Sequence, residues 1–139
     1  MRTQAIYYRA SDGTEPVNQF IDQLPAKAAA KIDNYVASFL NDQPPGAPPP
    51  EYPVSSQLEG ELRELRVRFA RTRYRIFYQR SGNLIVLLHA IEKSTGQVGR
   101  GEIMVARNRM IDFFRRMDAD PRLPPRAAGS DAPRARRTT

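Results

Sequence analysis

The sequence predicts an α+β fold, in which a twisted and mainly antiparallel sheet carries two N-terminal helices on one face and is followed by a C-terminal helix. Two patterns support this prediction. Apolar residues recur at helical spacing before residue 42 and after residue 101, whereas residues 62–91 show the alternation and apolar runs of strands. The 139 residues and the 40% hydrophobic content suit one domain with a modest core, which we place at residues 1–117.

The N-terminal part is expected to form a short strand over residues 4–9 and then two helices joined as an antiparallel hairpin that lies on the sheet. Thr14 is a candidate N-cap for the first helix, because Pro16 follows in its first turn and Pro25 ends the apolar pattern. The second helix is predicted over residues 26–42. The apolar residues of both helices, which we expect in the core, are Val17, Phe20, Ile21, Leu24, Ile32, Tyr35, Val36, Phe39 and Leu40.

Residues 44–53 are predicted to be an extended connector, because six of these ten positions are proline. A meander of three strands follows over residues 62–69, 73–80 and 84–91, and Ser81-Gly82-Asn83 is a turn signal between the last two. The last strand is almost entirely apolar, so we expect it at the centre of the sheet, covered on both faces.

A third helix is predicted over residues 101–117, packing at the edge of the sheet. Its apolar side is expected to comprise Ile103, Ala106, Met110, Phe113 or Phe114, and Met117. Residues 118–139 are rich in proline and arginine and poor in large apolar residues, so we expect a disordered basic tail. Such a tail acts either as an electrostatic arm or not at all.

The first two strands of the meander place arginine on the face opposite the core. Leu65, Val67 and Phe69 alternate with Glu64, Arg66 and Arg68, and Tyr74, Ile76 and Tyr78 alternate with Arg73, Arg75 and Phe77. A guanidinium binds phosphate through parallel hydrogen bonds and stays charged at working pH, so this face is predicted to hold phosphate, with Phe77 stacking a base. The alternative is a solvated face whose arginines pair with Glu59, Glu61, Glu64 and Glu92.

The composition restricts the classes of function. The net charge of +7 comes from an excess of arginine after residue 57, which favours an anionic partner, nucleic acid first. The chain has no cysteine and one histidine, which excludes disulfides, thiolate zinc sites and an all-histidine metal cage. We expect a cytoplasmic protein with no membrane partner, because neither a membrane-spanning run nor a signal-peptide pattern is present.

These residues suit a metal-free reaction on an RNA phosphodiester. The 2′-hydroxyl would attack the adjacent phosphate, and fixed cations would stabilise the charge that builds on its oxygens. His89 is a candidate proton carrier, and Lys93 lies two strand periods later on the same face. The alternatives are a structural imidazole, either at the sheet edge or under the third helix, and a solvent-exposed lysine at a strand end.

Several short motifs occur in a fixed order after residue 57. They are Leu58, Gly60, Leu62 and Glu64-Leu65-Arg66, then Arg73-Tyr74-Arg75-Ile76-Phe77-Tyr78, then Leu87-Leu88-His89-Ala90 and Lys93, and finally Glu102, Ile103 and Ala106. Together with the preceding strand and helices, this order resembles the RelE superfamily over about residues 4–115. More narrowly, it resembles the phage-derived HigB-type toxins of type II toxin–antitoxin pairs.

The resemblance implies a RelE-like fold and a toxin that cleaves mRNA, usually in the ribosomal A site, as a metal-independent endoribonuclease without cofactor. A helix-turn-helix, HigA-like antitoxin would neutralise it. The catalytic residues implied are Arg66, Arg73, Arg75, His89 and Lys93, and the RNA-binding residues implied are Arg68, Phe77, Tyr78 and Thr95. Tyr78 is the weaker candidate of the motif, because it falls on the core face of the predicted strand.

One segment departs from the HigB-type pattern. The lysine-rich run after the last strand, roughly K-K-T-x-K-T-P, is replaced by residues 92–99, in which only Lys93 and Thr95 match. Two other functions therefore stay open on the same fold. One is a non-catalytic inhibitor of gyrase like the ParE branch, and the other is a phage-derived protein that only binds RNA or a protein partner.

Overall fold

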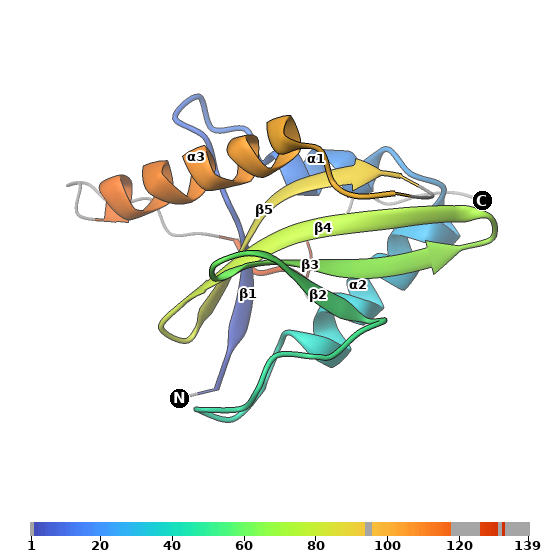
Figure 1. Cartoon of the computed structure of the whole chain (residues 1–139), viewed down its shortest axis with the longest axis horizontal. Coiled ribbons are helices and arrows are strands. Elements are labelled where there is room, and N and C mark those ends of the chain that lie inside the picture. Colours follow the sequence, from blue (N-terminus) through green and yellow to red (C-terminus); the bar gives the residue numbers. More distant parts are fainter. Residues whose placement is uncertain (1, 94–95, 118–125, 131, 133–139) are drawn as a thin grey trace.

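The computed structural model describes residues 2–93, 96–117, 126–130 and 132. Within these residues, one mixed sheet lies between helices on its two faces (Figure 1), which confirms the predicted α+β class and is consistent with a RelE-like fold. The elements in chain order are β1 (Gln4–Tyr7), α1 (Pro16–Asp22), α2 (Ala26–Phe39), β2 (Ser55–Glu59), β3 (Leu62–Phe69), β4 (Thr72–Ser81), β5 (Leu84–Glu92) and α3 (Arg100–Met117).

The sheet has the strand order β1-β5-β4-β3-β2. Strands β2 to β5 form an antiparallel meander, and β1 pairs in parallel with β5. Strand β5 lies inside the sheet between β1 and β4. Its apolar side chains belong alternately to the core clusters on the two faces of the sheet, so both faces are covered, as predicted. A two-residue loop of Gly82 and Asn83 joins β4 to β5, and the positive φ of 62° at Gly82 explains the glycine there.

Strand β2 was not predicted from the sequence. Its residues Ser55-Ser56-Gln57-Leu58-Glu59 are mostly polar, which is common in a strand at the edge of a sheet. The conformation of β2 is therefore decided by its pairing with β3 and not by a periodicity in its own sequence. The proline-rich residues 44–53 form neither helix nor strand, as predicted.

Helices α1 and α2 pack on one face of the sheet, where they bury Val17, Ile21, Ile32 and Val36 against β1, β3, β4 and β5. Helix α3 covers the opposite face through Ala106, Met110 and Phe113, which contact side chains from β1, β3, β4 and β5. The prediction that α3 packs at the sheet edge is thus wrong, because that face of the sheet has an apolar area of its own to bury. Phe113 rather than Phe114 faces the sheet, and the side chain of Met117 lies outside the described part.

Two predicted helix ends differ from those observed. Glu15 rather than Thr14 is the N-cap of α1, because the Thr14 hydroxyl donates to Asp12 Oδ1 at 2.7 Å in the preceding loop. Pro16 does occupy the first turn. Helix α2 ends at Phe39 rather than at residue 42, since Asn41 turns its side chain back to accept a hydrogen bond from the Ala5 amide at 2.6 Å.

The expectation of a disordered tail is wrong for residues 126–130 and 132. Ala127 forms an antiparallel bridge with Ile6, and hydrogen bonds run from the Ala128 amide to Ala5 O at 2.9 Å and from the Tyr7 amide to Arg126 O at 3.1 Å. Ala128 is fully buried in the core. We call residues 126–130 the C-terminal strap. The other predicted tail residues lie outside the described residues.

Within the described residues, no helix has the length and apolar character needed to cross a membrane.

Candidate active site

The arginines of the meander are brought together by the pairing of β3 with β4. Arg66 lies directly opposite Arg75, and Arg68 lies opposite Arg73. Like charges at directly opposed positions repel each other. Glu64, two residues before Arg66 on the same face of β3, supplies the opposing charge.

Above these strands lies a cavity of about 520 Å³, which we call the arginine cavity. Strands β3 and β4 contribute its charged floor, the edge strand β2 one wall, and the loop after β5 together with the start of α3 the other. Its lining residues are Ser56, Gln57, Leu58, Glu64, Arg66, Arg73, Arg75, Gly96, Gln97, Val98 and Ile103. Three guanidiniums around one carboxylate make this cavity suited to an anion with several oxygens.

Glu64 is the least expected member of this cavity. Its side chain is only 3% exposed, and its Oε1 lies 3.5 Å from Arg75 Nε and 4.0 Å from Arg66 Nε. Burial raises the pKa of Glu64 above its usual value, although Arg75, Arg66 and Arg73 act in the opposite direction. Among the described residues, the buried atoms Glu64 Oε1, Arg66 Nε and Arg75 Nε have no hydrogen-bond partner, so polar capacity is left for a ligand.

From the sequence, Glu64 is predicted only as a counter-ion and as part of the Glu64-Leu65-Arg66 motif. The sequence does single out this residue, since Glu64 is the one acidic residue on the arginine-bearing face of β3. What the sequence did not reveal is that the residues around it remove most of its contact with water. A carboxylate in this setting is a candidate proton acceptor rather than a surface partner of arginine.

The predicted arginines differ in exposure. Arg75 is buried, whereas Arg66 and Arg73 are partly accessible in the cavity, and Arg68 is exposed beside it. The alternative of a solvated arginine face is therefore wrong for Arg75. Arg66 and Arg73 could therefore contact an anion in the cavity, whereas Arg75 is placed to hold the Glu64 carboxylate.

His89 does not line the arginine cavity. His89 pairs with Phe77 of β4, just before a β-bulge, and lies on the face that α3 covers. Its Nε2 contacts Glu102 Oε2, and Arg109 donates to its Nδ1 at 3.3 Å. This pattern fits the tautomer with its proton on Nε2, and it uses both ring nitrogens to hold α3 on the sheet. These contacts agree with the alternative prediction, in which His89 has a structural role under the third helix.

Lys93 lies at the end of β5 next to the arginines, because its amide donates to Arg73 O at 3.0 Å. Its ammonium donates to Gln97 O at 2.7 Å, and Gln97 in turn lines the arginine cavity. Lys93 therefore remains beside the site. Thr95, the other match to the lysine-rich run, lies outside the described residues.

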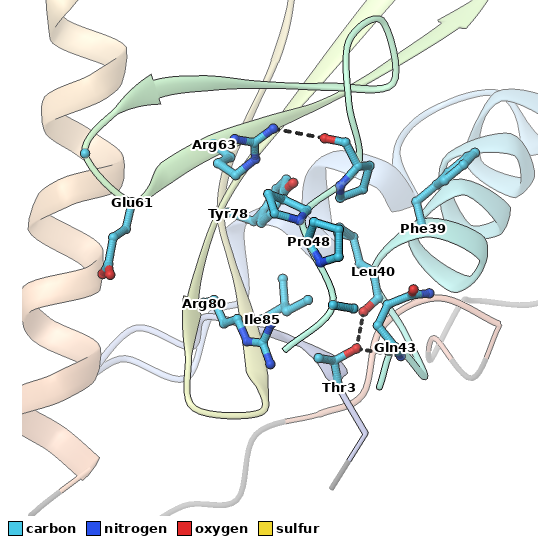
Figure 2. A pocket seen from close by; sticks show the side chains of 14 residues that line it. Thr3, Phe39, Leu40, Gln43, Pro48, Glu61, Arg63, Tyr78, Arg80 and Ile85 are labelled. Atoms are coloured by element: carbon cyan, nitrogen blue, oxygen red, sulfur yellow. Dashed lines mark hydrogen bonds between the residues drawn. The ribbon is translucent and has the colours of Figure 1, made fainter. Parts of the chain in front are cut away.

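The two predicted aromatic contacts with RNA are not available. Phe77 is 0% exposed and packs against Ala106 and Met110 beneath α3. The prediction that Phe77 stacks on a base is therefore wrong. Tyr78 lies on the opposite face of the sheet and shares a 2.7 Å hydrogen bond with Ser55 Oγ. Figure 2 shows Tyr78 beside Arg63 and Pro48 in a separate cavity of about 270 Å³. Both residues act in packing because each face of β4 is covered.

We expect replacement of Arg75 by alanine to destabilise the fold, because it leaves the buried Glu64 without its nearest cation. The loss should be about 2–3 kcal/mol in the free energy of unfolding. Arg73→Ala, at a partly accessible position of the same strand, should cost less than about 1 kcal/mol. Urea denaturation of the two variants compares them, and equal stabilities would contradict the role given to Arg75.

The fold and the site define a small α+β domain with an arginine-lined cavity around a buried carboxylate. The chain belongs to the phage-derived Gp49-like family: the family model described as Phage derived protein Gp49-like (DUF891) matches residues 19–111, which is more than half of the chain. That range includes every predicted site residue. No curated protein gives a significant match to the sequence.

Proposed function

We propose that this protein is the toxin of a type II toxin–antitoxin pair and that it cleaves mRNA on the ribosome. The observation that carries the proposal is the arginine cavity, in which a carboxylate of raised pKa lies among three guanidiniums. Membership of a phage-derived family and the ordered motifs shared with RelE-type toxins agree with it. The narrower likeness to HigB-type toxins stays part of the proposal.

In the proposed reaction, the scissile phosphate binds to Arg66 and Arg73 at the open side of the cavity. Glu64 accepts the proton of the adjacent 2′-hydroxyl as its oxygen bonds to phosphorus. The bond from phosphorus to the 5′-oxygen breaks, and that oxygen gains a proton from solvent, which leaves a 2′,3′-cyclic phosphate. The guanidiniums act on the oxygens where negative charge accumulates, and Lys93 adds positive charge beside them.

The test is induced expression in a bacterial host followed by primer extension on cellular mRNA. Growth arrest with new 5′ ends inside translated regions is the expected result. The Arg73→Ala variant should remove the cuts at unchanged protein level, because it deletes a phosphate contact without exposing the core. Growth arrest with intact mRNA and damaged gyrase would instead support the ParE-like alternative.

We expect cleavage on purified ribosomes to persist after divalent cations are lowered as far as ribosome integrity permits. The cavity presents guanidiniums where a metal-dependent nuclease presents carboxylates, so the phosphate charge is already countered. The measurement is the cleavage rate during titration with EDTA, with ribosome integrity followed by sedimentation. A rate that falls to zero while ribosomes stay intact, and returns with magnesium, would contradict the proposal.

A neutralising protein partner completes the proposal. Helix α3 exposes Met104 and Ile111, which share one side of the helix because they are spaced by about two turns. A protein partner would cover this apolar strip, as expected of an antitoxin. Co-expression of a neighbouring helix-turn-helix reading frame should restore growth, whereas Ile111→Asp should weaken that rescue.

A further inference from the structure

Tyr52 is a large aromatic side chain with no place in the core. At 69% exposure, it is the most exposed of the large hydrophobic side chains among the described residues. It lies at the end of the proline-rich connector, and the guanidinium of Arg66 is placed over its ring at 4.7 Å from the ring centre. Because Arg66 also lines the arginine cavity, Tyr52 stands at the border of the candidate site.

Beside the ring lies a second cavity of about 220 Å³, which we call the tyrosine cavity. Its lining residues are Tyr35, Tyr52, Pro53, Val54, Arg66, Arg68 and Arg73. Arg66 and Arg73 also line the arginine cavity, so the two cavities are neighbours that share two cations. The lining combines aromatic rings with guanidiniums, and none of the described residues that line it is acidic. A stacked base and its phosphates require such a surface.

The backbone on both sides of Tyr52 is held to β3. Arg63 donates to Pro50 O at 3.0 Å, a bond drawn in Figure 2, and the Arg66 amide donates to Val54 O at 2.7 Å. The connector is thus fixed before and after the exposed ring. A ring presented on a fixed segment loses little conformational freedom when a ligand stacks on it.

We propose that Tyr52 and Arg66 form a stacking platform for one base of single-stranded RNA, next to the phosphate held in the arginine cavity. This inference rests on the proposed function and adds a base-binding position to it. Stacking uses the face of the base, so the platform accepts unpaired bases with little preference for their identity. Bases already stacked in a duplex are excluded.

The chain contains no tryptophan, so Tyr52→Trp introduces a single indole fluorophore at the platform. A short single-stranded RNA at low salt should quench its emission, whereas the same strand without bases and a duplex of the same sequence should quench it much less. Tyr52→Ala should weaken binding of the single strand roughly 5- to 160-fold. Tyr52→Phe should bind as the parent does.

The matched control is Phe114, an exposed aromatic residue on α3 that lines neither cavity. Phe114→Trp should show no quenching by RNA, and Phe114→Ala should leave affinity unchanged. Anisotropy of a labelled RNA gives binding independently of the indole. If the single strand binds in an Arg73-dependent way while the indole emission and the Tyr52→Ala affinity stay unchanged, the platform is refuted and the proposed function stands. If no RNA binds and cellular mRNA stays intact, both are refuted.

Discussion

Glu64→Gln should lower the rate of mRNA cleavage on purified ribosomes at least about 100-fold, which is the lower end of the contribution of a positioned general base. Glutamine keeps the shape of the side chain but cannot accept the proton of the 2′-hydroxyl. Ribosome and mRNA binding should persist, because Arg66 and Arg73 are unchanged. The measurement is a single-turnover cleavage rate at saturating toxin, so that binding does not enter the comparison.

Glu61→Gln is the matched control, since Glu61 is an exposed glutamate on the turn before β3 and lies outside the arginine cavity. Its cleavage rate should equal that of the parent protein. Glu64→Asp withdraws the carboxylate by one methylene group. Its cleavage rate should lie between those of the parent protein and Glu64→Gln. A Glu64→Gln variant as active as the parent would exclude Glu64 as the proton acceptor.

The raised pKa of Glu64 also predicts two pH effects. Cleavage needs the deprotonated form, so the rate should rise with pH through a value above the ordinary 4.5, and Glu64→Gln should lack this rise. Stability should change in the opposite direction. The folded state binds the Glu64 proton more tightly than the unfolded state does, so the stability contributed by protonation is present below pH 4.5 and is lost as the pH rises through the folded-state pKa.

Thermal unfolding of the parent and Glu64→Gln at a series of pH values measures the second effect. Glutamine resembles the neutral carboxyl group, so the difference between the two proteins should change only within the pH range between the unfolded and folded pKa values. A constant difference across that range would show that the environment of Glu64 leaves its proton affinity unchanged.

Gly129→Ala should destabilise the protein by about 3–5 kcal/mol, combining left-handed backbone strain with overpacking. Gly129 has φ of 95°, and a Cβ there would lie 2.5 Å from Asn41 Nδ2 and 3.2 Å from the Ala37 amide nitrogen. Asn41 donates to Ala128 O at 2.9 Å and accepts from the Ala5 amide, so displacing its side chain separates the C-terminal strap from β1. The melting temperature should fall by roughly 10 °C or more.

Substitutions at two other glycines distinguish backbone strain from overpacking as causes of the lost stability. Gly13 has a similar φ of 89°, but a Cβ at this position would have no neighbour within 4 Å, so Gly13→Ala reports the backbone strain alone. Gly101 has neither a positive φ nor a close neighbour, and it lies in α3, so Gly101→Ala should be neutral or slightly stabilising. If Gly129→Ala lowers the free energy of unfolding no more than Gly13→Ala does, the strap is not packed against α2.

Deleting everything after Met117 tests the same contact from the other side. The strap donates and accepts hydrogen bonds along β1, and it buries Ala128 in the core. Its removal should therefore lower the melting temperature, as Gly129→Ala does. An unchanged melting temperature would restore the interpretation of this region as an unattached tail.

Local patterns in the sequence were enough to determine the α+β class, the meander and the alternation of its side chains. Strand periodicity depends on the backbone alone, so Arg66 and Arg75 could be placed on one face before any partner element was known. The turn at Gly82 could also be predicted from local sequence, because glycine tolerates the positive φ found there.

Burial and neighbourhood were decided by the tertiary structure, because they depend on which element covers each face. Helix α3 and the loop after β5 lie over the arginine face, which buries Phe77 and Arg75 and raises the pKa of Glu64. The connector brings Tyr52 against Arg66, a contact between elements whose order along the chain gives no sign of it. Alanine and glycine in the strap have too little apolar surface to signal burial, and only the close approach of β1 and α2 gives them a place in the core.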